Sequence, residues 1–344
     1  NVDLTNCDRE PIHIPGSIQP HGSMLVVHPY SYEIKYASSN IEDRLEVRAD
    51  DLVGMSLEGA LGAALTHDIR NALTVAATGY KTSVIVRAAL GENRPSCDIL
   101  VHEYEGFLFV ELEDAAPFDD TEIALHLTQS LVRRIDSETD IEPLSKAVAR
   151  LVRATLGYDR VMVYRFLHND AGRVIAEAKN TDLASYLGHH FPAGDIPAQA
   201  RRLYIENWVR VIGDTRFTPV ALVPRLSDGE APVDMSHAHL RSVSPIHCEY
   251  LRNMGVSASM SISIVVDGQL WGLVACHHDT PKTLSIPLRM AAELFGQYLS
   301  LHISAIENRQ AKVASIATRK KLDAIISTID REVPVEMTLK RKLN

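Results

Sequence analysis

The stretch that decides the fold is LRSVSPIHCEYLRNMGVSASMSISIVVDGQLWGLVACHH, residues 240–278. From residue 259 to residue 264 serine alternates with methionine or isoleucine, which is the period-two pattern of a strand with one polar face. The Asp-Gly pair at 267–268 predicts a tight hairpin turn, and residues 269–276 predict the strand that returns from it. The stretch therefore predicts an antiparallel hairpin within a larger sheet.

One face of this hairpin is polar. It carries Ser259, Ser261 and Ser263, while Arg241, His247 and Tyr250 enter from the segment that precedes it. A guanidinium group binds a carboxylate through two parallel charge-assisted hydrogen bonds, and hydroxyl groups add further donors. This combination predicts a pocket for a flat, anionic ligand.

Length and composition predict a two-domain globular protein. The chain has 344 residues, which is too long for one ordinary core. Apolar residues make up 46% and charged residues 23%, as in folded proteins, and the formal net charge of −9 argues against a nucleic-acid-binding surface. No apolar run approaches the ~20 residues that span a bilayer, and the first residues lack a signal-peptide pattern. We therefore expect a cytoplasmic protein that binds neither nucleic acid nor membrane.

The four cysteines predict free thiols in a reducing compartment. Cys7, Cys97, Cys248 and Cys276 form no close pair and no Cys/His spacing of a zinc site. Cys97 and Cys276 are expected to be small buried hydrophobic residues. Prolines at 11, 15 and 20 exclude a regular helix at the start of the chain, so Cys7 is expected on an extended arm.

The first half of the chain has the pattern of a small α+β domain. We expect strands at 23–27, 81–87 and 106–113, and helices at 40–45 and 65–77. A connector follows at 115–140, and Asp119 and Asp120 can cap a helix within it. A further helix is expected to begin at residue 139, with an inner stripe formed by Leu144, Val148 and Leu151.

The second half predicts an antiparallel sheet interrupted by two long loops. Strands are expected at 158–166, with Met162, Tyr164 and Phe166 on one face, and at 172–179. Residues 191–197, FPAGDIP, form an irregular loop that presents Asp195. Residues 217–239 are polar and lack periodicity, and a helix from 287 to about 330 is longer than one domain needs. We expect this helix to present an apolar side to a partner protomer.

These stretches closely resemble the biliverdin-binding photosensory part of a bacterial phytochrome. The resemblance extends from Asn6 to about Ile306 and is carried by NCDREPIHIPGSIQPHG (6–22), YDRVMVYRF (158–166), FPAGDIPAQARRLY (191–204) and the stretch at 240–278. The sequence departs from the family at Gly194, where the relatives have serine. The departure leaves Asp195 in place.

The resemblance implies an α+β fold: a PAS domain, which is an antiparallel sheet with helices, followed by a GAF domain, which is an antiparallel sheet flanked by helices, and a long C-terminal helix. The implied boundaries are an arm at 1–22, PAS at 23–114, the connector at 115–140, GAF at 141–306, and the signalling helix with the start of a PHY domain at 307–344. A figure-of-eight knot is also implied, in which the arm passes through a lasso formed by 217–239, with Ile18 near the crossing. Because relatives continue into PHY and histidine-kinase domains, we expect a fragment with an incomplete photocycle and increased fluorescence.

The implied cofactor is biliverdin IX alpha, a linear tetrapyrrole. In bacterial phytochromes the cysteine that matches Cys7 forms a thioether with the vinyl group of ring A. Plant and cyanobacterial relatives use a cysteine just before the histidine that matches His247, whereas Cys248 follows it. Cys248 therefore remains a second candidate thiol.

The resemblance also assigns the pocket residues. Arg210 and Arg241 suit one propionate, and the second is expected to meet the group Ser244, Ser259, Ser261 and His247. Asp195, beside Ile196, is expected to accept hydrogen bonds from the pyrrole nitrogens and to raise the pKa of the cationic chromophore. The end ring is expected to rotate among Tyr164, Phe191, Tyr204 and Tyr250, with its carbonyl hydrogen-bonded by His277.

The predicted function is red/far-red photoreception without enzymatic turnover, with autocatalytic attachment of the chromophore. Light isomerises the double bond between rings C and D, and the rearranged contacts bias the C-terminal helix. We expect a homodimer through the GAF and C-terminal helices, and PHY and histidine-kinase output in the full-length protein.

Two other functions were weighed. A PAS-GAF module could bind a small metabolite or a cyclic nucleotide without photochemistry, and it would need no thiol on the arm. A zinc hydrolase using the histidine pairs at 189–190 and 277–278 is disfavoured, because adjacent histidines on a strand point to opposite faces.

Overall fold

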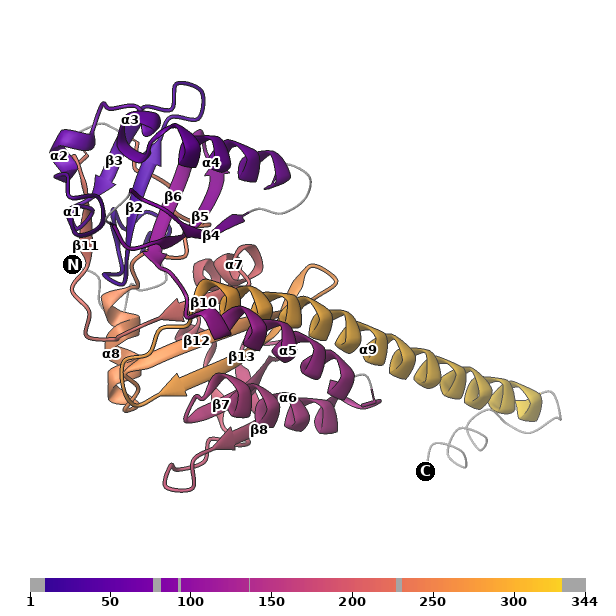
Figure 1. Ribbon diagram of the computed structural model, residues 1–344. Helices are drawn as coiled ribbons and strands as arrows, with labels where there is room; N and C mark the ends of the chain where they lie inside the picture. Colours follow the sequence, from indigo (N-terminus) through magenta and orange to yellow (C-terminus); the bar gives the residue numbers. More distant parts are fainter. Residues whose placement is uncertain (1–9, 77–81, 92–93, 136, 227–230, 330–344) are drawn as a thin grey trace.

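The computed structural model describes residues 10–76, 82–91, 94–135, 137–226 and 231–329. These residues form two bodies, each built on an antiparallel sheet, with one long helix that extends away from the second body (Figure 1). The α+β class, the order of the two domains and the long C-terminal helix are as the sequence predicted.

The first sheet has the strand order β1-β11-β3-β2-β6-β5-β4. Its N-terminal strands are β1 (Ser17–Ile18), β2 (Gly22–Val27), β3 (Ile34–Ser38), β4 (Ser83–Ala88), β5 (Cys97–Tyr104) and β6 (Phe107–Asp114). The helices beside it are α1 (Glu42–Leu45), α2 (Ala49–Leu52), α3 (Leu57–Leu61) and α4 (Ala63–Ala76). The three expected strands and both expected helices are confirmed, whereas β3 and β5 were missed.

The strand β11 (Val220–Val223) comes from the loop that was expected at 217–239, yet it completes the first sheet between β1 and β3. Ile18 is fully buried where the arm meets this loop. It pairs with Val220 on β11 and forms a bridge with Arg241, which follows the loop. The two ends of the predicted lasso therefore hold Ile18 between them, and residues 227–230 of the loop lie outside the described residues.

The second sheet has the order β10-β12-β13-β7-β8-β9. Its strands are β7 (Arg160–Phe166), β8 (Gly172–Lys179), β9 (His190–Phe191), β10 (Val209–Ile212), β12 (Ala258–Val266) and β13 (Gln269–His278). The predicted hairpin is confirmed: Asp267 and Gly268 turn the chain with φ of 50° and 75°, as a two-residue turn of this kind requires. β13 runs two residues further than expected and includes His277 and His278.

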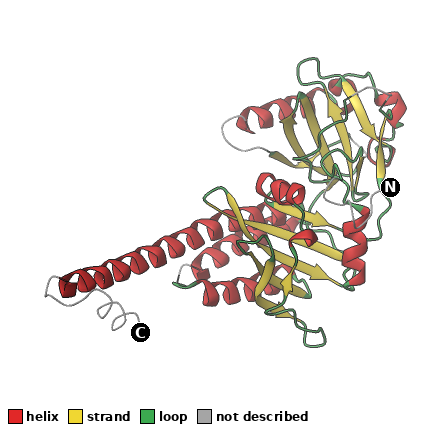
Figure 2. Ribbon diagram, turned by 180° about the vertical axis from the view of Figure 1, so that it is seen from behind, coloured by secondary structure: helices red, strands yellow, loops and turns green. Residues whose placement is uncertain are grey.

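Three helices cover one face of this sheet, namely α5 (Phe118–Ile135), α6 (Ile141–Leu156) and α9 (Ile286–Ile329) (Figure 2). The apolar residues that alternate with the serines of β12 pack against them; Ile262, for example, shares a core with Val148 of α6 and Phe295 of α9. Burial of each such side chain stabilises the fold by about 1.5–3 kcal/mol. Because this face is filled by the core, the serines must line the other face.

Helix α9 has two apolar sides. Phe295, Leu299 and Ile303 are buried against the sheet, whereas Leu294 and Leu301 are 48% and 71% exposed. Residues 308–323 are all exposed. Arg309 and Gln310 still hydrogen-bond Thr139 and Asp140, so the helix leaves the domain after Gln310. No helix in the described part of the chain is long and apolar enough to cross a membrane.

Candidate functional site

The free face of the second sheet forms the floor of a cavity. A space of about 390 Å³ lies under α7 (Ala198–Glu206) and α8 (Pro245–Asn253), and it adjoins a smaller space of about 90 Å³ directly over the sheet. Both spaces are lined by Asp195, Tyr204, Arg210, His247 and Tyr250, so they form one continuous site.

Thirteen of the fifteen residues predicted for the site line this cavity. They are Tyr164, Phe191, Asp195, Ile196, Tyr204, Arg210, Arg241, Ser244, His247, Tyr250, Ser259, Ser261 and His277. Cys7 lies outside the described residues. Cys248 is buried on α8 and is not among the lining residues. The structure thus brings the predicted group together, while the role of each residue in binding stays a prediction.

The floor of the cavity combines hydroxyl groups with a neutral imidazole. Ser259 of β12 lies opposite His277 of β13 in the register of the two strands, and both side chains line the cavity. Burial lowers the pKa of His277 to about 3, so the ring is neutral at physiological pH. Its Nδ1 atom is buried and has no hydrogen-bond partner among the described residues. A buried polar atom without a partner is costly, and a ligand in the cavity can satisfy it.

Asp195 closes the cavity from the irregular loop. It ends a short 3₁₀ turn, Ala193–Asp195, and its Oδ2 atom accepts a hydrogen bond of 3.1 Å from the hydroxyl of Tyr250. Burial and the negative charge of Asp195 both raise the pKa of Tyr250. The same two causes raise the pKa of Tyr164 to about 12. Both phenols therefore stay protonated and act as hydrogen-bond donors beside a carboxylate.

The N-terminal arm also reaches the cavity. Glu10 and Ile12 are lining residues, and the hydroxyl of Ser244 donates a hydrogen bond of 2.5 Å to Glu10. On the opposite side Ser263, which was expected to share the polar face, donates instead to the carbonyl of Tyr204 at 2.6 Å. Ser263 therefore fastens α7 to the sheet.

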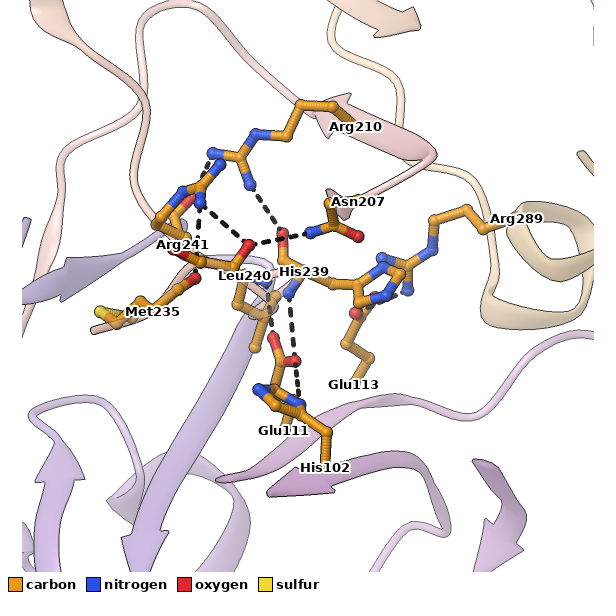
Figure 3. A network of polar contacts seen from close by, with 11 residues as sticks. His102, Glu111, Glu113, Asn207, Arg210, Met235, His239, Leu240, Arg241 and Arg289 are labelled. Atoms are coloured by element: carbon orange, nitrogen blue, oxygen red, sulfur yellow. Dashed lines mark hydrogen bonds and ion pairs between the residues drawn. The ribbon is translucent and has the colours of Figure 1, made fainter. Parts of the chain in front are cut away.

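The buried Arg241 and the half-buried Arg210 give the cavity a positive charge. Arg210 donates to the carbonyls of His239 and Ser242 at 3.2 and 3.1 Å, and Arg241 donates through Nη1 to the carbonyl of Ser236 at 3.1 Å (Figure 3). Burial lowers the pKa of Arg210 to about 10 and that of Arg241 to about 9, so both stay cationic at neutral pH. Among the described residues, Nε and Nη2 of Arg241 have no acceptor. These donors suit a carboxylate.

His247 lines the cavity together with the two arginines and Asp195. Burial, and secondarily the charge of Arg210, lowers the pKa of His247 to about 4, so its ring is neutral as well. The ring stacks on Tyr250, with 6.2 Å between centroids and an interplanar angle of 13°. The cavity therefore offers flat walls, neutral donors and acceptors, and a cationic end.

Several lining residues were not predicted. These are Met162, Leu273 and Ala275. Met162 was placed on the face of Tyr164 but not assigned to the site, and Ala275 and Leu273 lie two and four positions before His277 on the same strand. The period-two pattern could have found them. Glu10 carries no comparable signal, because only the folded path of the arm brings it to the cavity.

The histidine pairs do not form a zinc site. His277 lines the cavity, whereas His278 lies 2.6 Å from Asp159 outside it. In the part of the chain that the structure describes, the single cluster with metal-ligand spacing is Asp159, His278 and Asp279. Asp159 already accepts hydrogen bonds from the Asp279 amide at 3.0 Å and the Asn180 side chain at 2.8 Å. These bonds give the cluster a structural role at the end of the sheet.

Comparisons with known proteins agree with this architecture. Residues 7–115 match the PAS fold family and residues 140–305 match the GAF domain family. The chain is 41% identical over 325 residues to a bacteriophytochrome of Pseudomonas aeruginosa, covering 93% of this chain and 44% of that protein. It is 40% identical to cyanobacterial phytochrome B of Nostoc sp., covering 90% of this chain and 42% of the relative. The chain therefore spans less than half the length of these curated relatives.

Solved structures give the same result. The chromophore-binding domain of a Stigmatella aurantiaca bacteriophytochrome in the Pr state is 39% identical, with a TM-score of 0.78, and the match covers 87% of this chain and 99% of that one. The corresponding domain of a bacteriophytochrome from R. palustris is 38% identical, with a TM-score of 0.78, over 89% and 99% of the two chains. The fold and the site thus define a PAS-GAF module of the phytochrome class. Within that class, the chain belongs to the bacteriophytochrome family.

Proposed function

We propose that this chain is the photosensory part of a red/far-red light receptor and that it binds biliverdin IX alpha covalently. The observation that carries the proposal is the cavity itself, in which flat apolar walls, the two arginines and Nδ1 of His277, which has no partner among the described residues, face one space. The membership in the bacteriophytochrome family supports it.

The donor set of the cavity suits a linear tetrapyrrole with two propionates. Arg241 offers its remaining N–H groups to one propionate, with Arg210 beside it. Ser259, Ser261 and the neutral ring of His247 suit the second propionate. Because the arginines are removed from water, a carboxylate between them forms stronger bonds than it would at the surface.

The residues at the other end suit the pyrrole nitrogens and the end ring. Biliverdin, when bound, supplies the absorption of light and the isomerisation between rings C and D. The carboxylate of Asp195 accepts hydrogen bonds from N–H groups and favours a protonated ligand by its charge. In the tautomer that carries its proton on Nδ1, His277 donates that N–H to a carbonyl of the end ring, and Tyr164 walls the space in which the ring turns.

We further propose that Cys7 forms the covalent bond. Glu10, three residues after Cys7, lines the cavity, and three residues span at most about 10 Å. Cys248 is the weaker candidate, because burial raises the pKa of its thiol to about 11 and the thiolate is the nucleophile. Attachment of the chromophore to Cys7 would be autocatalytic, and the chain would otherwise be a sensor without turnover.

The partners belong to the same proposal. Leu294 and Leu301 of α9 and Leu125 of α5 are exposed apolar residues on helices that contact each other, and they suit a homodimer interface. In the full-length protein, α9 would pass the signal to a PHY domain and a histidine kinase in the cytoplasm. Nothing in this arrangement calls for nucleic acid or a membrane.

A mixing experiment separates the photoreceptor from a metabolite-binding or cyclic-nucleotide-binding module. The apoprotein is incubated with biliverdin, and its absorption spectrum is recorded before and after red and far-red illumination. We expect a far-red band that differs from free biliverdin and changes on illumination. A spectrum equal to that of free pigment, together with thermal stabilisation by a cyclic nucleotide, would contradict the proposal.

A further inference from the structure

A buried polar network joins the first domain to the segment that carries Arg241 (Figure 3). At its base lies Glu111 of β6, whose side chain is fully buried. Its two carboxylate oxygens accept hydrogen bonds from the backbone amides of His239 and Leu240, at 3.1 and 2.6 Å. Glu111 does not line the cavity, so its carboxylate holds the main chain from outside the site.

The same short segment is held from the cavity side by its carbonyl groups. The guanidinium group of Arg210 donates hydrogen bonds to the carbonyl of His239 and also to those of Arg241 and Ser242. The amides of residues 239 and 240 are therefore fixed by the first domain, and the carbonyls of residues 239, 241 and 242 by Arg210 of the second. A rotation of these peptide units would break both sets of bonds and would move Arg241, which follows directly.

Glu111 forms no ion pair with a lysine or arginine among the described residues, and burial raises the pKa of its carboxyl to about 7, so that the group is ionised above that pH. His102 lies beside it, with Nδ1 3.8 Å from Oε1, but burial lowers the pKa of His102 to about 3 and leaves the ring neutral. The His102 ring stacks on Phe109 at 4.7 Å, and neither of its nitrogens has a hydrogen-bond partner among the described residues. The two backbone amides are thus the main polar partners of this buried carboxylate, which ties its position to that of the segment.

A second carboxylate on the same strand shows that the interface has a separate attachment. Glu113, two residues further along β6, forms a buried ion pair of 2.6 Å with Arg289 of α9. This pair joins the domains through side chains, and in the described part of the chain neither partner hydrogen-bonds the backbone of residues 239–241. Burial, and secondarily the charge of Arg289, lowers the pKa of His239, so the pair acts on that side chain and not on the two amides. Fastening the two domains and orienting the segment before Arg241 are therefore tasks of different residues.

We propose that Glu111 is a positioning residue for carboxylate recognition: by fixing the amides of His239 and Leu240, the first domain sets the orientation of Arg210 and Arg241 toward the propionate of the chromophore. This inference rests on the proposed function, because it concerns the same cavity. Glu111 of the first domain would then help to determine which ligands the cavity of the second domain selects.

The test compares Glu111→Gln with Glu113→Gln as a matched control. Glutamine at 111 keeps the shape but sets an NH₂ group against one of the two backbone amides, so one hydrogen bond is lost and a buried donor is left unpaired. Glutamine at 113 weakens the interface but leaves the two amide hydrogen bonds to Glu111 in place. For each protein the dissociation constant is measured for biliverdin and for its dimethyl ester, which lacks both carboxylates, at pH 8. Cys7 is replaced by Ser in all proteins so that binding stays reversible.

We expect the reference protein to prefer biliverdin over the ester, and Glu111→Gln to lose at least about tenfold of that preference. Glu113→Gln should keep the preference even if its thermal stability falls. An unchanged preference in Glu111→Gln, or an equal loss in both variants, would overturn the positioning role. If the reference protein binds neither pigment, the proposed function fails instead.

Hydrogen exchange in the apoprotein gives a readout that needs no pigment. Exchange at the amides of residues 239 and 240 should be at least about tenfold faster in Glu111→Gln than in Glu113→Gln, relative to amides of the hairpin at 258–278. Equal exchange in the two variants would contradict the proposal. If Glu111→Gln does not fold, Glu111→Asp, which keeps the charge but withdraws it by one methylene, is measured in the same way and should show the same direction of change.

Discussion

Replacing Gly172 by alanine should displace the ring of Tyr164 from the wall of the cavity. Gly172 begins β8, and a Cβ atom built there lies 1.6 Å from Cζ and 1.7 Å from the hydroxyl of Tyr164. The φ angle of Gly172 lies outside the left-handed region, so alanine brings no backbone strain. The whole effect must therefore come from the ring.

The structure sets the size of this effect. Tyr164 is only 7% exposed, and its ring contacts those of Phe166 and Phe191 at 5.2 and 5.9 Å between centroids. Forcing the ring out of this cluster should destabilise the domain by about 1–3 kcal/mol. In the background of Tyr164→Ala the space is vacated, and Gly172→Ala should be close to neutral there. The expected coupling free energy of the double-mutant cycle is therefore about 1–3 kcal/mol.

Urea unfolding of the apoprotein, followed by tryptophan fluorescence, measures these free energies. Both tryptophans, at residues 208 and 271, lie in the second domain, so the signal reports the domain that contains the mutation. Gly194→Ala is the control, because a Cβ atom there meets nothing within 4 Å, and it should change stability by less than about 0.5 kcal/mol. If Gly172→Ala lowers the free energy of unfolding by the same amount in the wild type and in Tyr164→Ala, the reasoning is refuted.

Three further predictions concern the cavity. In the folded apoprotein the pKa of His247 is lowered to about 4 and that of His277 to about 3. The unfolded chain therefore binds more protons than the folded chain below pH 6.5. The free energy of unfolding should fall as the pH falls from 6.5 toward 4. Urea midpoints across this range should show a shallower decline in His277→Gln; an equal decline would contradict the assignment. Tyr250→Phe removes the hydrogen bond to Asp195 and should cost about 1 kcal/mol in urea unfolding, but nothing in an Asp195→Ala background. Cys248 should resist alkylation by iodoacetamide at pH 8 in the native apoprotein and react in urea, since burial raises its pKa to about 11; rapid native labelling at Cys248, read by mass spectrometry, would show that its thiol is accessible.

The regular hairpin and the helix faces could be predicted from the sequence because their patterns are local. Serine alternates with apolar residues along β12, and the apolar stripe at Leu144 and Val148 marks the inner face of α6. β5 was missed because it carries Asp98 and His102 at fully buried positions, which break the apolar pattern of a strand. The folded chain makes Asp98 acceptable by giving its carboxylate two backbone amides, those of Arg87 and Ala116.

Long-range pairing explains the other failures. β11 has four residues, and it becomes a strand only through pairing with β1 and β3, which are about 200 residues away in the sequence. The residues of the site could be predicted from family motifs and alternation, but the hydrogen bonds of Arg210 and Glu111 to the segment at 239–242 could not. These bonds depend on how the two domains meet, and no local pattern encodes that arrangement.

Peptide mapping of the pigment adduct tests the central claim most directly. The apoprotein is incubated with biliverdin, denatured and digested, and the peptides are analysed by mass spectrometry for the wild type, Cys7→Ser and Cys248→Ser. The account predicts one biliverdin on the peptide that contains Cys7, lost in Cys7→Ser and retained in Cys248→Ser. An adduct on Cys248 in the wild type, or no adduct in a protein that binds the pigment, would contradict it.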